Sequence, residues 1–127
     1  MYKYDTVIRL RDTDAAGVVF FAAYFEVAHD CYESFIDITN IIKNEDFTIP
    51  VVHAEADYAL PLCAGDKITV QITLAKIGKC SFTLDYEMVK QDGTSAAKIR
   101  TVHATVSKKT SKPLKIPDSI KKRLEDI

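Results

Sequence analysis

The chain has 127 residues, of which 47% are hydrophobic and 28% are charged, so it fits a single globular domain. Its formal net charge of −1 argues against a protein that binds nucleic acid by neutralising phosphates, and its apolar content argues against disorder. No window approaches the ~20 apolar residues that span a bilayer, so we expect a cytoplasmic single domain over residues 1–127, with no membrane partner.

The first half of the chain predicts a strand, a turn and a long helix. Polar and apolar residues alternate over residues 2–10, as in a half-buried strand, and the acidic sequence RDTDAAG then predicts a turn. From Phe21 to Ile36 apolar residues recur at helical spacing. The opposite helix face is polar and carries Glu26, His29, Asp30 and Glu33. The polar segment 37–47 predicts a loop with room for a short second helix.

The second half predicts four strands in succession. Residues alternate over 52–58, 68–74 and 82–88, and a last long strand reaches Val106. Turn sequences separate them, at Pro61, Gly65-Asp66, Gly78 and Gln91-Asp92-Gly93. Pro117 opens a short tail helix. A single amphipathic helix and an antiparallel sheet of about five strands bury their apolar faces most simply against each other, which predicts an α+β fold.

The segment between the first strand and the helix, DTDAAGVVFF (residues 12–21), is the first candidate site. Asp12 and Asp14 could cap the helix, but the helical period begins about seven residues after Asp14, and neither Phe20 nor Phe21 can cap it. The first helical amides are then left for a ligand. Such amides can polarise a carbonyl group while a nearby carboxylate supplies or activates a nucleophile.

The second candidate is His53-Ala54-Glu55-Ala56-Asp57, where three ionisable side chains share one strand face. They span about 13 Å, too far for one metal ion, and for Glu55 and Asp57 we favour a solvent-facing role. The three cysteines include no CxxC pair and are expected to be reduced, so no metal or cofactor is predicted. His29 and His103 are expected to be structural. No serine-hydrolase or nucleotide-binding motif is present. If the protein is a hydrolase, a carboxylate must therefore take the role that a serine triad usually has.

Two segments resemble a known family. RDTDAAGVVFFAAYFEVAHDCYESF (residues 11–35) resembles the strand-loop-helix opening of the hotdog-fold acyl-CoA thioesterases of the 4-hydroxybenzoyl-CoA thioesterase family. IPVVHAEADYALPLCAGDKITV (residues 49–70) resembles that family's central strand, proline and Gly-Asp turn. Within the family the sequence looks most like the 1,4-dihydroxy-2-naphthoyl-CoA hydrolases of quinone biosynthesis. Many other members carry a histidine where Phe21 stands here, which favours an aromatic acyl group.

The resemblance implies a role for five residues. The family's catalytic carboxylate falls on Asp14, acting as nucleophile or as base, and its carbonyl-polarising amide falls on the Phe21 N–H. Gly17 would let the loop pack closely, and His53 would line the acyl pocket. Lys79 would meet the phosphates of the acyl-CoA substrate. Hotdog sites form between subunits, so the resemblance also implies a homodimer or a homotetramer.

Three other functions stay open at the level of sequence. A broad-specificity thioesterase for short or medium acyl chains would use the same site. A hotdog dehydratase acting on carrier-protein substrates needs a histidine paired with an acid, and the early motif has no histidine. A non-catalytic acyl-CoA-binding module would bind acyl-CoA without releasing CoA.

Overall fold

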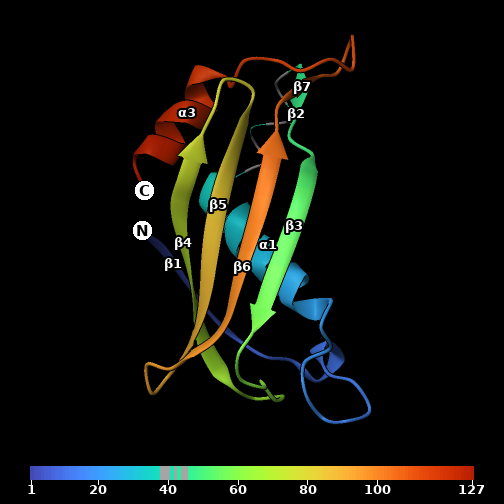
Figure 1. Ribbon diagram of the computed structural model, residues 1–127, viewed down its shortest axis with the longest axis vertical. Coiled ribbons are helices and arrows are strands. Elements are labelled where there is room, and N and C mark those ends of the chain that lie inside the picture. Colours follow the sequence, from blue (N-terminus) through green and yellow to red (C-terminus); the bar gives the residue numbers. More distant parts are fainter. Residues whose placement is uncertain (38–40, 42, 44–45) are drawn as a thin grey trace.

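The computed structural model describes residues 1–37, 41, 43 and 46–127. Within these residues a long helix, α1 (Ala23–Ile36), crosses one face of a five-stranded antiparallel sheet (Figure 1). The strands of the sheet are β1 (Tyr2–Val7), β3 (Val51–Tyr58), β4 (Lys67–Ile77), β5 (Ser81–Lys90) and β6 (Ser95–Ala104). Their order is β1-β4-β5-β6-β3, so β1 and β3 form the edges. The predicted α+β architecture is confirmed.

Shorter elements complete the chain and correct some predicted boundaries. The first strand ends at Val7 rather than at residue 10, because the chain turns into a 3-10 helix (Leu10–Asp12) that leaves Leu10 79% exposed. The last strand is split by Thr105 into β6 and a short β7 (Val106–Ser107), which pairs with β2 (Phe47–Thr48). The tail helix is present as α3 (Asp118–Glu125). The second helix predicted within 37–47 lies outside the described residues.

The core lies between α1 and the sheet. The helix buries the face predicted from its periodicity, and its polar face is exposed. At its C-terminal end Asp37 adopts a left-handed conformation with φ of 52°. Each fully buried Ile or Leu contributes about 1.5–3 kcal/mol relative to an exposed one. The most deeply buried aliphatic side chains are Ile36, Leu62, Val70, Ile72, Leu84, Met88 and Ile120.

The edge strand β3 lacks this burial. Apolar and polar residues alternate along it, yet every side chain except the half-buried Ala56 is exposed. Val52 is 60% exposed, and Tyr58, at the end of the strand, is 46% exposed. A long edge strand with exposed apolar side chains can pair with another strand.

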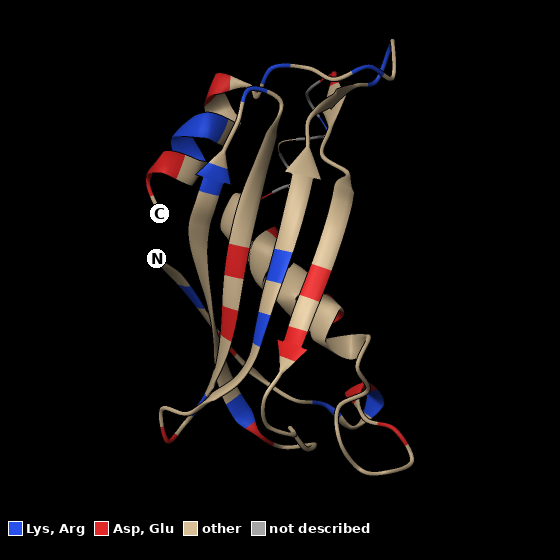
Figure 2. Cartoon of the chain, in the orientation of Figure 1, with Lys and Arg blue, Asp and Glu red and all other residues tan. Residues whose placement is uncertain are grey.

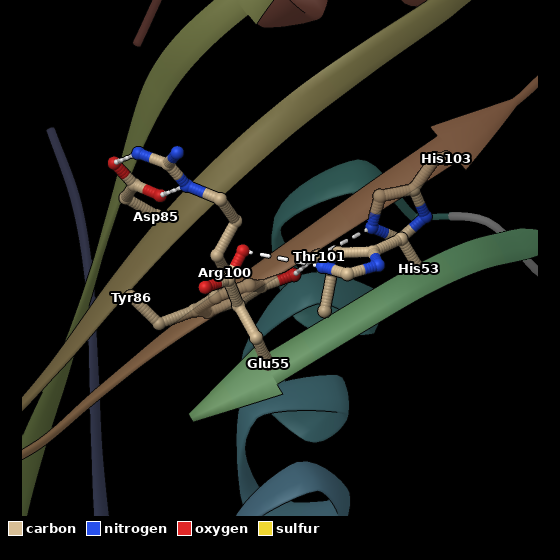
Figure 3. Close-up of polar contacts among 7 residues, drawn as sticks. All are labelled: His53, Glu55, Asp85, Tyr86, Arg100, Thr101 and His103. Atoms are coloured by element: carbon tan, nitrogen blue, oxygen red, sulfur yellow. Dashed lines mark hydrogen bonds and ion pairs between the residues drawn. The ribbon is translucent and has the colours of Figure 1, made fainter. Parts of the chain in front are cut away.

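The sheet face opposite α1 carries charges in rows. Acidic residues on β3 and β5 flank basic residues on β6 (Figure 2). Arg100 donates two hydrogen bonds to Asp85, of 2.7 and 2.9 Å, and Lys98 lies 3.8 Å from Glu87 (Figure 3 shows the first pair). These pairs are exposed and screened by solvent, so each adds little to stability. Glu55 and Asp57 lie on this face exposed to solvent, as predicted.

A buried polar network lies on the helix side of the sheet. His103 is fully buried, with its ring between those of Tyr32 and Phe82 at centroid distances of 4.4 and 5.0 Å. Its Nε2 lies 2.8 Å from the hydroxyl of Thr101, which in turn donates to the Tyr86 hydroxyl at 2.9 Å (Figure 3). Burial, helped by the nearby His29, lowers the pKa of His103 to about 4. The imidazole is therefore neutral in the folded protein at neutral pH.

This burial predicts a stability that falls in mild acid. The unfolded imidazole binds a proton below its ordinary pKa of about 6.5, whereas the folded one does so only near pH 4. The free energy of unfolding should therefore drop between these pH values, by up to about 3 kcal/mol from this residue. Urea unfolding of His103→Gln should show a shallower dependence over that window than the wild type.

The matched control is His53→Gln, which removes a histidine that is exposed on β3. It should retain the drop in the free energy of unfolding that the burial of His103 causes. Equal slopes for His103→Gln and the wild type would contradict the prediction.

Candidate active site

The loop before α1 is held in one conformation by its own backbone. Thr13 and Val19 form an antiparallel bridge, and the Asp14 N–H donates to the Val18 carbonyl at 3.0 Å. The Gly17 N–H donates back to the Asp14 carbonyl at 3.0 Å. Gly17 has φ of +82°, a conformation that strains any residue with a side chain. The turn predicted at RDTDAAG is thus confirmed, and Gly17 allows its tight closure.

Contacts with a distant segment fix where this loop lies. The Val19 N–H donates to the Leu62 carbonyl at 2.8 Å, and Val18 forms a bridge with Cys63. The Asp66 carboxylate accepts the Cys63 N–H at 2.8 Å and so holds that segment in its own turn. The PLCAGD turn therefore supports the loop that leads into the helix.

The helix start has unpartnered amides. The helix begins at Ala23 rather than at Phe21, and its N-cap, Ala22, offers no capping side chain, so the predicted uncapped start is observed at a later residue. Among the described residues, no hydrogen-bond acceptor engages the N–H of Phe21 or that of Ala22, whereas the Ala23 N–H donates to the Phe20 carbonyl at 2.9 Å. These two amides lie at the positive end of the α1 dipole. They can stabilise a negatively charged oxygen.

Asp14 is exposed and makes a local contact. Its Oδ1 accepts the Ala16 N–H at 2.9 Å, which leaves Oδ2 without a hydrogen bond among the described residues. Within that part of the chain, no hydrogen bond or ion pair joins Asp14 to Phe21, His53 or Lys79. The loop supplies the carboxylate, but a single chain does not connect it to the other predicted site residues.

His53 and Lys79 lie away from the loop. His53 is exposed on β3, with Nε2 3.2 Å from Oε1 of Glu55 (Figure 3). Lys79 is exposed in the turn between β4 and β5, where its carbonyl accepts the Ile116 N–H at 2.9 Å. That turn is at the opposite end of the sheet from the loop before α1 (Figure 1).

Tyr58 reaches the helix start and was not among the residues predicted from sequence. Its hydroxyl donates to the Phe21 carbonyl at 2.9 Å, and its ring lies 4.8 Å from that of the buried Tyr24. Burial and the neighbouring Tyr58 raise the pKa of Tyr24. The contact joins residues 37 positions apart, so no local pattern signals it.

The surroundings of the helix start are aromatic. Phe20 and Phe21 are 45% and 61% exposed, with ring centroids 4.7 Å apart. By contrast, a hollow of about 410 Å³ on the outer face of the sheet is lined mostly by charged and polar residues, including Glu55, Asp85 and Arg100. Asp14, Gly17, Phe21, His53 and Lys79, the residues to which the family resemblance gives a role, do not line it. An aromatic group would therefore bind more favourably beside the helix start than in that hollow.

Two further properties concern the residues that the structure describes. No three of their His, Cys, Asp or Glu side chains are arranged to hold a metal ion. None of the helices they form combines the length and the apolar character needed to cross a membrane.

Comparisons with known proteins identify relatives along almost the whole chain. The model of the thioesterase-like superfamily matches residues 8–124. A 1,4-dihydroxy-2-naphthoyl-CoA hydrolase from Rippkaea orientalis is 34% identical, over 94% of this chain and 92% of its own length. A protein of the same name from Nostoc punctiforme is 33% identical, over 98% of this chain and 86% of its own length.

A solved structure agrees with these relatives. The crystal structure of a 1,4-dihydroxy-2-naphthoyl-CoA thioesterase from Synechocystis superposes with a TM-score of 0.92 at 30% identity. The match covers 99% of this chain and 96% of that one. The hotdog fold and the family predicted from the sequence motifs are both confirmed.

Proposed function

Since the chain belongs to the thioesterase-like superfamily, we propose that it hydrolyses an acyl-CoA thioester, with 1,4-dihydroxy-2-naphthoyl-CoA as substrate. Membership makes it a thioesterase-family hydrolase. The choice of acyl group is supported by the names of its relatives at 30–34% identity over nearly their full length. With this substrate, the reaction would belong to quinone biosynthesis.

The observation that carries the chemistry is the pair of unpartnered amides at Phe21 and Ala22. A thioester carbonyl gains negative charge on oxygen when a nucleophile attacks it, and the Phe21 N–H can donate to that oxygen. One such donor typically lowers the barrier by about 2.7–4 kcal/mol. The exposed rings of Phe20 and Phe21 provide apolar surface for an aromatic acyl group next to these amides.

In this proposal, the Asp14 carboxylate acts either as a nucleophile or as a general base. It either attacks the carbonyl carbon to form an anhydride that water then cleaves, or it removes a proton from the attacking water. In both cases the C–S bond breaks, and the thiolate of CoA leaves and takes up a proton. The acyl group is released as a carboxylic acid that contains one oxygen atom from water. The free Oδ2 of Asp14 is the atom available for this step.

We further propose that the active form is at least a homodimer that pairs through β3, with a homotetramer as a larger assembly. The exposed apolar side chains of this edge strand support this. Antiparallel pairing of β3 with its copy would invert one sheet relative to the other. The end that carries Lys79 in one protomer would then lie level with the Asp14 loop of its partner, with His53 near the junction.

A substrate panel tests the acyl group. We expect CoA release from 1,4-dihydroxy-2-naphthoyl-CoA with a kcat/KM at least tenfold above that for benzoyl-CoA or medium-chain acyl-CoAs. Free thiol is measured as CoA appears. Equal values across the panel would support the broad-specificity alternative, and saturable binding without CoA release would support a non-catalytic module.

Replacing Asp14 tests the carboxylate. Asp14→Asn should lower kcat by about 10²–10⁴-fold, because the amide neither attacks nor accepts a proton. The matched control is Asp92→Asn. The Asp92 carboxylate accepts the Thr94 N–H at 2.9 Å, the same contact with residue i+2 that Asp14 makes with Ala16. Asp92, however, lies in the β5–β6 hairpin, away from the start of α1. Unchanged turnover in Asp14→Asn would show that another group performs this step.

Replacing Val52 tests the pairing edge. Val52→Lys places a charge on exposed apolar surface of β3 and should shift the protein toward monomer in sedimentation velocity, with a parallel loss of kcat. Leu114→Lys, an exposed apolar position in the C-terminal segment, is the control and should leave the oligomer unchanged. A wild type that sediments as a fully active monomer would refute the proposed assembly.

A further inference from the structure

We propose that Tyr58 is a positioning residue that sets the direction of the unpartnered Ala22 N–H at the start of α1. The proposal rests on the function argued above and adds to it a residue from another part of the chain. Tyr58 would not touch the substrate's reacting atoms. It would act through the backbone of Phe21 and Ala22.

Two contacts hold the peptide units on either side of Phe21. The Phe20 carbonyl accepts the Ala23 N–H at 2.9 Å, and the Phe21 carbonyl accepts the Tyr58 hydroxyl at 2.9 Å. Because a peptide unit is planar, holding its carbonyl also holds the N–H on its other side. The first contact therefore orients the Phe21 N–H, and the contact with Tyr58 orients the Ala22 N–H.

Tyr58 is held by the sheet and by the helix. It is the last residue of β3, paired with Ala97 of β6. Directly after it, the N–H groups of Ala59 and Leu60 both donate to the Ala96 carbonyl, at 2.9 and 3.0 Å. Its ring packs at 59° on that of Tyr24, which is only 4% exposed. The donor is thus fixed by the sheet on one side and by the helix core on the other.

Among the described residues, no neighbouring group replaces the Tyr58 hydroxyl at the Phe21 carbonyl. Ala22 has no side chain that could cap the helix, and the Phe20 N–H is already committed to the Asp12 carbonyl at 2.9 Å. Among the described side chains, the Tyr58 hydroxyl is the one whose hydrogen bond reaches the carbonyl of Phe21. Without it, the Phe21–Ala22 peptide unit could rotate, since the first turn of a helix lacks the bonds that hold its interior.

The test is Tyr58→Phe, which keeps the ring on Tyr24 and removes only the hydroxyl. We expect kcat for the preferred acyl-CoA to fall about three- to tenfold, the size of one ordinary hydrogen bond, with KM changed less than twofold. In two-dimensional NMR of the free protein, the amide signal of Ala22 should shift. Tyr58→Leu should lower kcat at least as much.

Tyr2→Phe is the matched control. Tyr2 is also a strand tyrosine whose ring packs on α1, at 5.3 Å from that of Phe35, and whose hydroxyl lies 2.6 Å from that of Ser34. It lies at the other end of the helix, so its variant should keep the wild-type kcat and the Ala22 amide signal.

The outcomes separate this inference from the proposed function. Wild-type kcat or an unmoved Ala22 amide signal in Tyr58→Phe would overturn the role of Tyr58, even if the wild type hydrolyses acyl-CoA. An equal loss of kcat in Tyr2→Phe would also overturn it, as a general effect of a lost helix contact. If the wild type hydrolyses nothing in the panel, the proposed function fails, and the amide shifts still decide whether Tyr58 orients this peptide.

Discussion

An uncapped helix start is the feature on which the rest of this structure depends. The first N–H groups of a helix have no acceptor within the helix, and many helices satisfy one of them with a polar side chain at the N-cap. Here the N-cap is Ala22, and the amides of Phe21 and Ala22 stay without acceptors in the described part of the chain. The loop, the Leu62–Cys63 segment and Tyr58 all hold the backbone around these amides. That arrangement keeps the two amides in place and open to an oxyanion.

The sequence predicted most of the architecture because its signals are local. Helical spacing from Phe21 to Ile36 and strand alternation after Pro50 each depend on neighbouring residues, and both are observed, with the helix beginning at Ala23. The uncapped start followed from the identity of Phe20 and Phe21. The ends of elements were less predictable. Leu10 continued the alternation of the first strand, but the hydrogen bond from the Arg9 N–H to the Asp12 carboxylate, 2.9 Å long, favours a turn there.

Non-local contacts explain what the sequence did not predict at the site. Alternation assigned Tyr58 to the apolar side of its strand, which its packing on Tyr24 bears out, but its hydroxyl acts on a backbone group 37 positions earlier. The exposure of β3 is likewise a property of strand order, since β3 is an edge only because β6 pairs with β5 on its other side. Neither the Tyr58 contact nor the edge position of β3 can be predicted from the spacing of residues along the chain.

The distribution of the predicted site residues also has a physical reason. The Asp14 loop and the turn with Lys79 lie at opposite ends of one sheet (Figure 1). Within the described residues, a single sheet covered by α1 on one face offers no second wall to close a pocket between them. A substrate as long as an acyl-CoA needs contacts at both its acyl and its nucleotide ends. The apolar surface left open along β3 would favour association, and association would in turn supply the missing wall. Catalysis and assembly would then depend on the same exposed strand, whose last residue holds the backbone that carries the oxyanion donors.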